Sequence, residues 1–209
     1  MKKNYLKYIA GMLACVIVAT TSTTAFAEIN YTYVNVDNAT DVTGNVIITD
    51  DGVTINGIYY TKAEFESLLN KAVKVETAQT RIAIAAGVYF IPGIGEIVIA
   101  ATGAILVTGV AVAAGSWLYN TITNWLSNST AKGIAEVRAK IPSRLRNENG
   151  DVDLGQFDQK VKGTTAYKEK GGWMIDKDNA EHGGRKWKLK DKSGDRVASL
   201  GENGEVLGK

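Results

Sequence analysis

The sequence predicts an α+β chain in which three unlike segments follow an N-terminal leader. Hairpin turn signals between β-prone residues occur in the N-terminal third and again near the C-terminus. A long apolar stretch rich in glycine and alanine lies between them. The charge is also divided: residues 28–131 carry 4 Lys/Arg against 9 Asp/Glu, whereas residues 132–209 carry 17 against 13. We therefore expect a basic C-terminal module that meets an anionic partner.

The first 27 residues have the three parts of a secretory signal peptide. Lysines near the N-terminus are followed by the apolar run 8–19 and then by Ala25-Phe26-Ala27, an A-x-A-like cleavage site before Glu28. The apolar run is short for a membrane span, although an N-terminal membrane anchor remains the alternative. The single cysteine, Cys15, falls within the leader, so the secreted chain would hold no disulfide and no thiol nucleophile.

Residues 28–80 predict an accessory module made of a β-hairpin and a helix. Asp50-Asp51-Gly52 separates two β-prone runs, and Asn56-Gly57 offers a second turn. Residues 61–64 read as a capping box, in which Thr61 and Glu64 satisfy each other's backbone N–H groups. The helix that follows is expected to continue to about Thr77, and no residue in this module has a catalytic pattern.

Residues 81–127 predict a Gly-rich hydrophobic helical hairpin. Only one charge, Glu96, lies between Ile82 and Gly115, and Pro92-Gly93 divides the stretch into two arms. The second arm, residues 97–115, reaches the length needed to span a membrane. Two alternatives stay open: the hairpin inserts into a bilayer, making membrane contact through residues 82–119, or it packs as the core of a soluble protein.

Residues 128–140 read as a linker and a short helix that Pro142 should end. The module 141–209 then contains many turn signals. Strand-like runs between the later turns, at residues 173–175, 186–190, 196–200 and 206–207, predict a small antiparallel sheet. Asp153 is placed to cap a short helix.

A lysine pattern on one predicted strand indicates nucleic-acid binding. Residues two apart on a strand point to the same face, so Lys186, Lys188 and Lys190 share one face, and Trp187 and Leu189 share the other. Neighbouring ammonium groups repel unless an anion lies across them, and an RNA or DNA backbone supplies that anion. The alternative is an edge strand whose lysines prevent aggregation.

Asp176, Asp178 and His182 form a DxDxxxH pattern next to these lysines. A carboxylate can orient an imidazole, and the imidazole can move protons near neutral pH. RNA supplies its own nucleophile, the 2′-hydroxyl, so its cleavage requires a base, an acid and cations around the phosphate. His182, the two Asp, the lysines and Arg196 meet that list without a metal or another cofactor.

Residues 140–209 resemble the C-terminal toxin domains of bacterial polymorphic-toxin and contact-dependent inhibition systems. Within these they are similar to a novel-toxin family of predicted RNases with a DxDxxxH motif. The segments that carry the resemblance are residues 140–145, 149–154, 172–173, 178–184, 186–190 and 203–207. Residues 196–199 match the family's Arg-x-Gly-Ser/Thr element except at Ala198, and the apolar segment resembles a pre-toxin region.

The resemblance implies a metal-independent endoribonuclease that is exported to act on the RNA of competing cells, with a cognate immunity protein as its partner. The expected catalytic residues are His182, Asp178, Asp176 and Arg196, and the expected RNA-binding residues are Lys186, Lys188, Lys190, Trp187 and Ser199. Two alternatives remain. In the first, the chain is a membrane-active protein that acts through residues 82–119, and its C-terminal module only binds anionic polymers. In the second, the C-terminal module binds RNA without cutting it.

Overall fold

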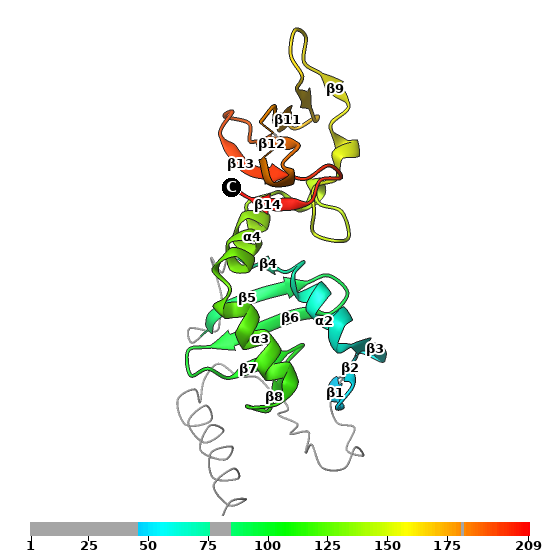
Figure 1. The fold of residues 1–209 in the computed structure, drawn as a ribbon, viewed down its shortest axis with the longest axis vertical. Helices are drawn as coiled ribbons and strands as arrows, with labels where there is room; N and C mark the ends of the chain where they lie inside the picture. The colour runs from blue at the N-terminus through cyan, green and yellow to red at the C-terminus, as the bar shows by residue number, and fades with distance from the viewer. Residues whose placement is uncertain (1–45, 76–84, 181) are drawn as a thin grey trace, which may run out of the picture. The chain divides into compact units, whose positions relative to one another are not determined.

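The computed structural model describes residues 46–75, 85–180 and 182–209, and it shows a mixed α/β chain (Figure 1). The described residues form three small antiparallel sheets together with the α-helices α2, α3 and α4. This confirms the predicted mixture of helices and antiparallel strands. The predicted signal peptide and the start of the accessory module lie outside the described residues.

The chain divides into two compact units. The first contains the described residues of Met1–Phe65, Thr77–Val88 and Ile94–Thr123. The second contains those of Glu66–Glu76, Tyr89–Gly93 and Asn124–Lys209, and therefore includes all of the predicted RNase module.

The accessory module begins as a three-stranded meander with the order β1-β2-β3. The strands are β1 (Val46–Ile48), β2 (Gly52–Ile55) and β3 (Ile58–Thr61). Both predicted turns are confirmed. At the second, Asn56 and Gly57 have φ of 52° and 81°, the left-handed pair that a tight two-residue hairpin requires.

The capping box at Thr61 and Glu64 is confirmed. The Glu64 carboxylate accepts the Thr61 N–H at 2.8 Å, and the Thr61 hydroxyl accepts the Glu64 N–H at 3.3 Å. Helix α2 (Lys62–Leu69) starts there and buries Phe65 and Leu69. It ends at Leu69, well before the expected Thr77, because β4 (Val73–Lys74) follows and pairs with β5.

The predicted helical hairpin is wrong, because residues 85–112 form strands. β5 (Ala85–Ile91), β6 (Gly95–Ala100), β7 (Ile105–Val107) and β8 (Val110–Val112) continue the sheet β4-β5-β6-β7-β8. These runs are rich in Val and Ile, whose branched side chains fit strands better than helices. The connecting turns contain Gly93, Gly103 and Gly109 with φ between 83° and 86°. None of the helices among the described residues is long and apolar enough to cross a membrane.

A helix does occur at the end of this segment. α3 (Trp117–Ser127) and α4 (Ser129–Ala139) are separated by Asn128, whose side chain accepts the N–H groups of Thr130 and Ala131 and so caps α4. The predicted linker is therefore reduced to one capping residue. Helix α4 ends before Pro142, as predicted.

The predicted sheet of the C-terminal module is confirmed as a six-stranded meander with the order β14-β13-β12-β11-β10-β9. Its strands are β9 (Gln159–Lys160), β10 (Tyr167–Lys168), β11 (Met174–Lys177), β12 (Trp187–Lys190), β13 (Arg196–Leu200) and β14 (Val206–Gly208). The short 3-10 helices are η1 (Ser143–Leu145), η2 (Leu154–Gln156) and η3 (His182–Gly184). Asp153 caps η2 by accepting the Gly155 N–H, as predicted.

One face of this sheet covers the core of the module. The buried side chains come from the sheet, from α4 and from the segment between them: Val137, Ile141, Leu145, Val152, Phe157, Trp173, Ile175, Leu189, Ala198, Leu200 and Val206. Because successive residues of a strand point to opposite sides, the residues between these sheet positions face away from the core. That outer face carries the candidate site.

Candidate functional site

The candidate site lies on the outer face of three neighbouring strands of the C-terminal sheet, β11, β12 and β13. The register aligns Asp176 on β11 with Lys188 on β12, and Lys188 with Ser199 on β13. The next row, Ile175, Leu189 and Ala198, is buried in the core. The predicted alternation of lysines and apolar residues on β12 is therefore confirmed.

A bulge brings Arg196 to the same face. Lys190 pairs with Arg196 rather than with Val197, because the register of β12 and β13 shifts between Leu189 and Lys190. The Arg196 guanidinium donates to the Ser199 hydroxyl at 2.6 Å and lies 3.8 Å from the Asp178 carboxylate. A bulge often re-aims a side chain in this way, and it places the arginine beside the acidic pair.

The two predicted carboxylates are each matched by a lysine of β12. Lys188 Nζ lies 3.1 Å from Asp178 Oδ1, and Lys190 Nζ lies 3.1 Å from Asp176 Oδ2. Thr165 also donates to Asp176, at 3.3 Å. The structure thus brings together six predicted site residues: Asp176, Asp178, Lys188, Lys190, Arg196 and Ser199. The lysines are not the open row of cations that the sequence pattern indicated.

Asp178 is held in its charged form. The hydrogen bond from Lys188 lowers the pKa of its carboxyl group, and the Ala180 N–H and the charges of Lys188 and Arg196 act in the same direction against the effect of burial. A carboxylate with a lowered pKa donates no proton near neutral pH. Asp178 can therefore position cations, but it is a poor general acid or base.

His182 lies in the loop between β11 and β12. The loop is closed at its base, where the Asp178 N–H donates to the Lys186 carbonyl at 2.8 Å, and its tip forms η3. Gly183 and Gly184 follow His182 with φ of 64° and 76°. The imidazole is exposed, and within the described residues it forms no hydrogen bond or ion pair with either Asp. The expected carboxylate–imidazole contact is therefore not present in the structure.

The remaining two predicted RNA-binding residues, Lys186 and Trp187, are both partly buried. Lys186 is partly buried beside the loop, and its backbone N–H donates to the Leu200 carbonyl. Trp187 packs against the core, and its ring meets the Tyr167 ring edge-on at 6.4 Å. Trp187 therefore contributes to the fold more directly than to a stacking surface for bases.

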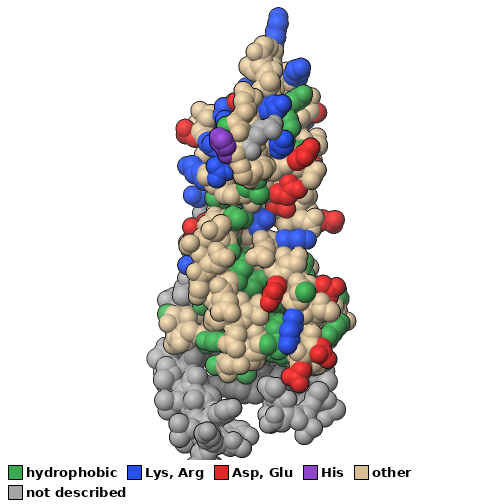
Figure 2. Space-filling view, viewed as in Figure 1, with side chains coloured by type: hydrophobic (Ala, Val, Ile, Leu, Met, Phe, Trp, Pro, Cys, Tyr) green, Lys and Arg blue, Asp and Glu red, His purple; other side chains and the backbone are tan. Residues whose placement is uncertain are grey.

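Strands β9 and β10 and the turns that follow them carry exposed lysines that sequence reasoning missed. Lys160, Lys162, Lys168 and Lys170 are exposed, whereas Glu169 between them is buried. Figure 2 shows Lys and Arg side chains gathered over the part of the chain that holds β9 to β13, with acidic side chains among them. The dense lysine spacing at residues 160–170 was the available signal. It adds positive charge to the same sheet.

Glu169 and Arg144 form a second feature that sequence reasoning missed. The two terminal guanidinium nitrogens of Arg144 donate to the Glu169 carboxylate, at 2.5 and 3.0 Å, and the N–H groups of Gly171 and Trp173 also donate to it. The arginine hydrogen bonds lower the pKa of Glu169 to about 2. This pair fastens η1 to the β10–β11 turn.

Among residues 46–75, 85–180 and 182–209, no group of three or more His, Cys, Asp or Glu side chains is placed to hold a metal ion. Comparisons of the chain with protein-family models, curated proteins and solved structures find no match. The toxin-domain resemblance therefore stays a prediction, and the functional argument depends on the geometry of the sheet face.

Proposed function

We propose that residues 141–209 form a small RNA-cleaving domain. The observation that supports this most is the arrangement around the β11–β12 loop. An exposed imidazole, His182, projects from a loop whose base adjoins Lys188 and Arg196 on a basic sheet face. A phosphodiester on this face would meet cations and an imidazole that can accept or donate a proton.

The proposed chemistry is transesterification by the RNA itself. The 2′-hydroxyl oxygen forms a bond to phosphorus while the bond from phosphorus to the 5′-oxygen breaks. His182 takes the proton from the 2′-hydroxyl, and water or the protonated imidazole returns a proton to the leaving 5′-oxygen. Lys188 and Arg196 stabilise the negative charge that develops on the phosphoryl oxygens.

The two carboxylates have a positioning role in this proposal. Asp178 fixes Lys188 and lies close to Arg196, and Asp176 fixes Lys190. Fixed cations stabilise developing charge without first reorganising, which is how electrostatic catalysis lowers a barrier. This differs from the sequence-based prediction, in which the carboxylates orient the imidazole directly.

The proposal includes a cellular context. The predicted signal peptide at residues 1–27 would direct the chain out of the cell that makes it. The exported chain would then meet intracellular RNA only after it enters another cell. An exported toxin that cuts the RNA of competing bacteria fits these features, and its producer would need a cognate immunity protein as a partner.

The test uses the chain that starts at Glu28 and a short RNA labelled at its 5′ end. We expect products ending in a 2′,3′-cyclic phosphate, and no cleavage when the 2′-hydroxyl is replaced by hydrogen. His182→Ala should reduce the rate by about 10²-fold or more, the usual contribution of a general acid or base. Glu202→Ala, an exposed change in the β13–β14 turn, is the control that should keep full activity.

Salt-sensitive RNA binding without any product would show a binding module and would contradict the proposal. The membrane-active alternative, which acts through residues 82–119, was motivated by the uncharged arm 97–115 of an expected helical hairpin. Residues 85–112 form strands joined by turns instead, so a helical hairpin no longer supports this alternative.

A further inference from the structure

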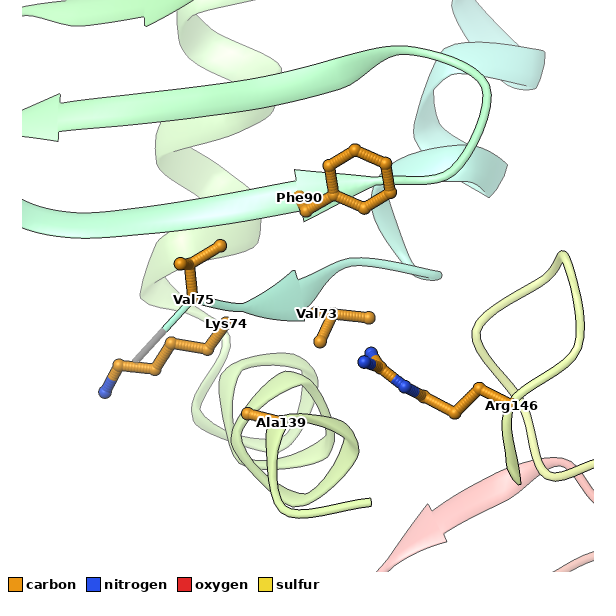
Figure 3. Close-up of a pocket in the computed structure, with 6 residues that line it drawn as sticks. All are labelled: Val73, Lys74, Val75, Phe90, Ala139 and Arg146. Atoms are coloured by element: carbon orange, nitrogen blue, oxygen red, sulfur yellow. The ribbon is translucent and has the colours of Figure 1, made fainter. Parts of the chain in front are cut away.

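The second unit contains a pocket that is open to solvent and lined by both apolar and charged side chains, apart from the candidate RNA site. It has a volume of about 280 Å³ and lies among β4, β5, the end of α4 and the loop after η1. Figure 3 shows the residues that line it: Val73, Lys74, Val75, Phe90, Ala139 and Arg146. Phe90 is 47% exposed, so an apolar ring remains accessible at this site.

Arg146 is the unusual residue of the pocket. Its side chain extends from its loop toward Val73 (Figure 3). The Nε atom is enclosed and lacks a hydrogen-bond partner, and the guanidinium makes no ion pair within the described residues. A partly buried guanidinium is normally matched by a carboxylate or a phosphate, because its desolvation is otherwise uncompensated.

Two carboxylates of the same unit are committed to other groups. Asp151 Oδ1 accepts from Arg138 at 2.8 Å and from the Val206 N–H at 3.1 Å. Glu136 is paired with Lys74 at 2.8 Å, and the Lys74 ammonium points away from Arg146 (Figure 3). Of the two cations that line the pocket, Lys74 is thus paired with a carboxylate, and no ion pair of Arg146 occurs within the described residues.

The surroundings disfavour the charge on Arg146. Burial lowers the pKa of its guanidinium, and the positive charge of Arg138 lowers it further. An arginine in such a position weakens the fold unless something compensates for it. A bound anion would compensate, since a guanidinium and a carboxylate match in shape and charge.

We propose that this pocket binds a small amphiphilic carboxylate, with its head on Arg146 and its aliphatic body against Val73, Val75 and Phe90. A volume of about 280 Å³ lies just below the range of about 300–1,000 Å³ that is usual for ligand pockets, so we expect a small ligand. A single guanidinium suits a monoanion better than a phosphate dianion. The inference is independent of the proposed cleavage of RNA.

The first experiment is calorimetric titration of the chain that starts at Glu28. Hexanoate, with eight heavy atoms, should bind at least about tenfold more tightly than hexanol, which lacks the charge, because a charge-assisted hydrogen bond contributes that much. It should also bind more tightly than acetate, which lacks the aliphatic body. Equal binding of all three, no binding of hexanoate, or tighter binding of inorganic phosphate would overturn the proposal.

The second experiment asks whether Arg146 is kept for binding or for stability. Arg146→Met should lose hexanoate binding by at least about tenfold without lowering the midpoint of thermal unfolding, because it removes an unmatched charge. Lys170→Met, which removes an exposed lysine, is the matched control and should bind normally. A lower midpoint in Arg146→Met, or unchanged binding, would indicate a structural arginine.

A third measurement avoids substitution altogether. Hexanoate added to the unaltered protein should shift the backbone amide NMR signals of Val75 and Phe90 while leaving those of β13 in place. Shifts confined to β12 and β13 would place the anion on the lysine face and would overturn the assignment to this pocket.

Discussion

Replacing Glu169 with glutamine should make the C-terminal sheet less stable at neutral pH and less sensitive to acid. The Glu169 side chain is 3% exposed and accepts hydrogen bonds from Arg144, Gly171 and Trp173. Glutamine has nearly the same shape, but it carries no charge and offers one acceptor oxygen instead of two. The substitution therefore removes the charge of this contact without opening a cavity, and it places an amide NH₂ against two of the N–H donors.

The magnitude follows from the shift in pKa. The carboxyl of Glu169 titrates at about 2 in the fold instead of the ordinary 4.5. A shift of this size corresponds to about 3 kcal/mol. Because the Arg144 side chain is 49% exposed, solvent screens part of the interaction, and we expect about 2 kcal/mol.

The sign of the pH effect is fixed by the direction of the shift. A lowered pKa in the folded state gives stability that is fully present above pH 4.5 and is lost as the pH falls from 4.5 through 2. The free-energy difference between the original chain and Glu169→Gln should therefore be largest at pH 7 and less than half as large at pH 3.

The assay is urea unfolding at pH 7 and at pH 3, followed by the folded-state methyl NMR signal of Leu189, which is fully buried in this sheet. Glu202→Gln, at an exposed position, is the control and should change stability at neither pH. If Glu169→Gln costs the same free energy at both pH values, the ion pair is not the source of the stability and the reasoning fails.

Two further substitutions test the sheet. Leu189→Ala should destabilise the sheet by about 2–5 kcal/mol, because removing a fully buried leucine side chain leaves a cavity. The same urea assay, followed by another core methyl signal, measures this loss. A loss below about 1 kcal/mol would contradict the packing. Asp178→Asn should release Lys188 and Arg196, so RNA should bind more tightly and with a steeper dependence on salt, by up to about two phosphate contacts. Filter binding at several salt concentrations measures that change, and unaltered affinity would show that these cations do not contact RNA.

Local signals in the sequence predicted the hairpins and the capping box well. Asn56-Gly57 and the capping box formed by Thr61 and Glu64 depend on interactions within four residues, so their outcome is decided before tertiary packing. The meander of the C-terminal module followed from the same kind of evidence. Short turns between β-prone runs favour antiparallel pairing of neighbouring strands, because parallel strands require long crossover connections.

The apolar segment was mispredicted because hydrophobicity alone does not distinguish a buried strand from a buried helix. A nearly uncharged run has no polar face from which a period can be read. The better evidence was available in the high content of Val and Ile and in the glycines at positions 93, 103 and 109, each of which occupies a turn between strands.

The site was predicted in part, because its members depend on different kinds of information. The alternation of Lys188, Leu189 and Lys190 is local to one strand and was predicted. The match of Asp176 to Lys190 depends on the register of two strands and on the length of the loop between them. A sequence pattern such as DxDxxxH lists these residues in order, but it does not say which of them will meet.

The register changes how the DxD pattern should be interpreted. In the sequence-based prediction, the two carboxylates are free of the lysines and orient the His182 imidazole. In the structure, Asp176 and Asp178 are each paired with a lysine of β12. If RNA binds this face as proposed, the two carboxylates reduce its affinity, because they offset the charge of the cations. A catalyst must bind the transition state better than the substrate. Carboxylates that weaken RNA binding but hold Lys188 and Lys190 in place suit that requirement, whereas a module that only binds RNA gains nothing from them. The two carboxylates therefore favour the proposed reaction over the binding-only alternative.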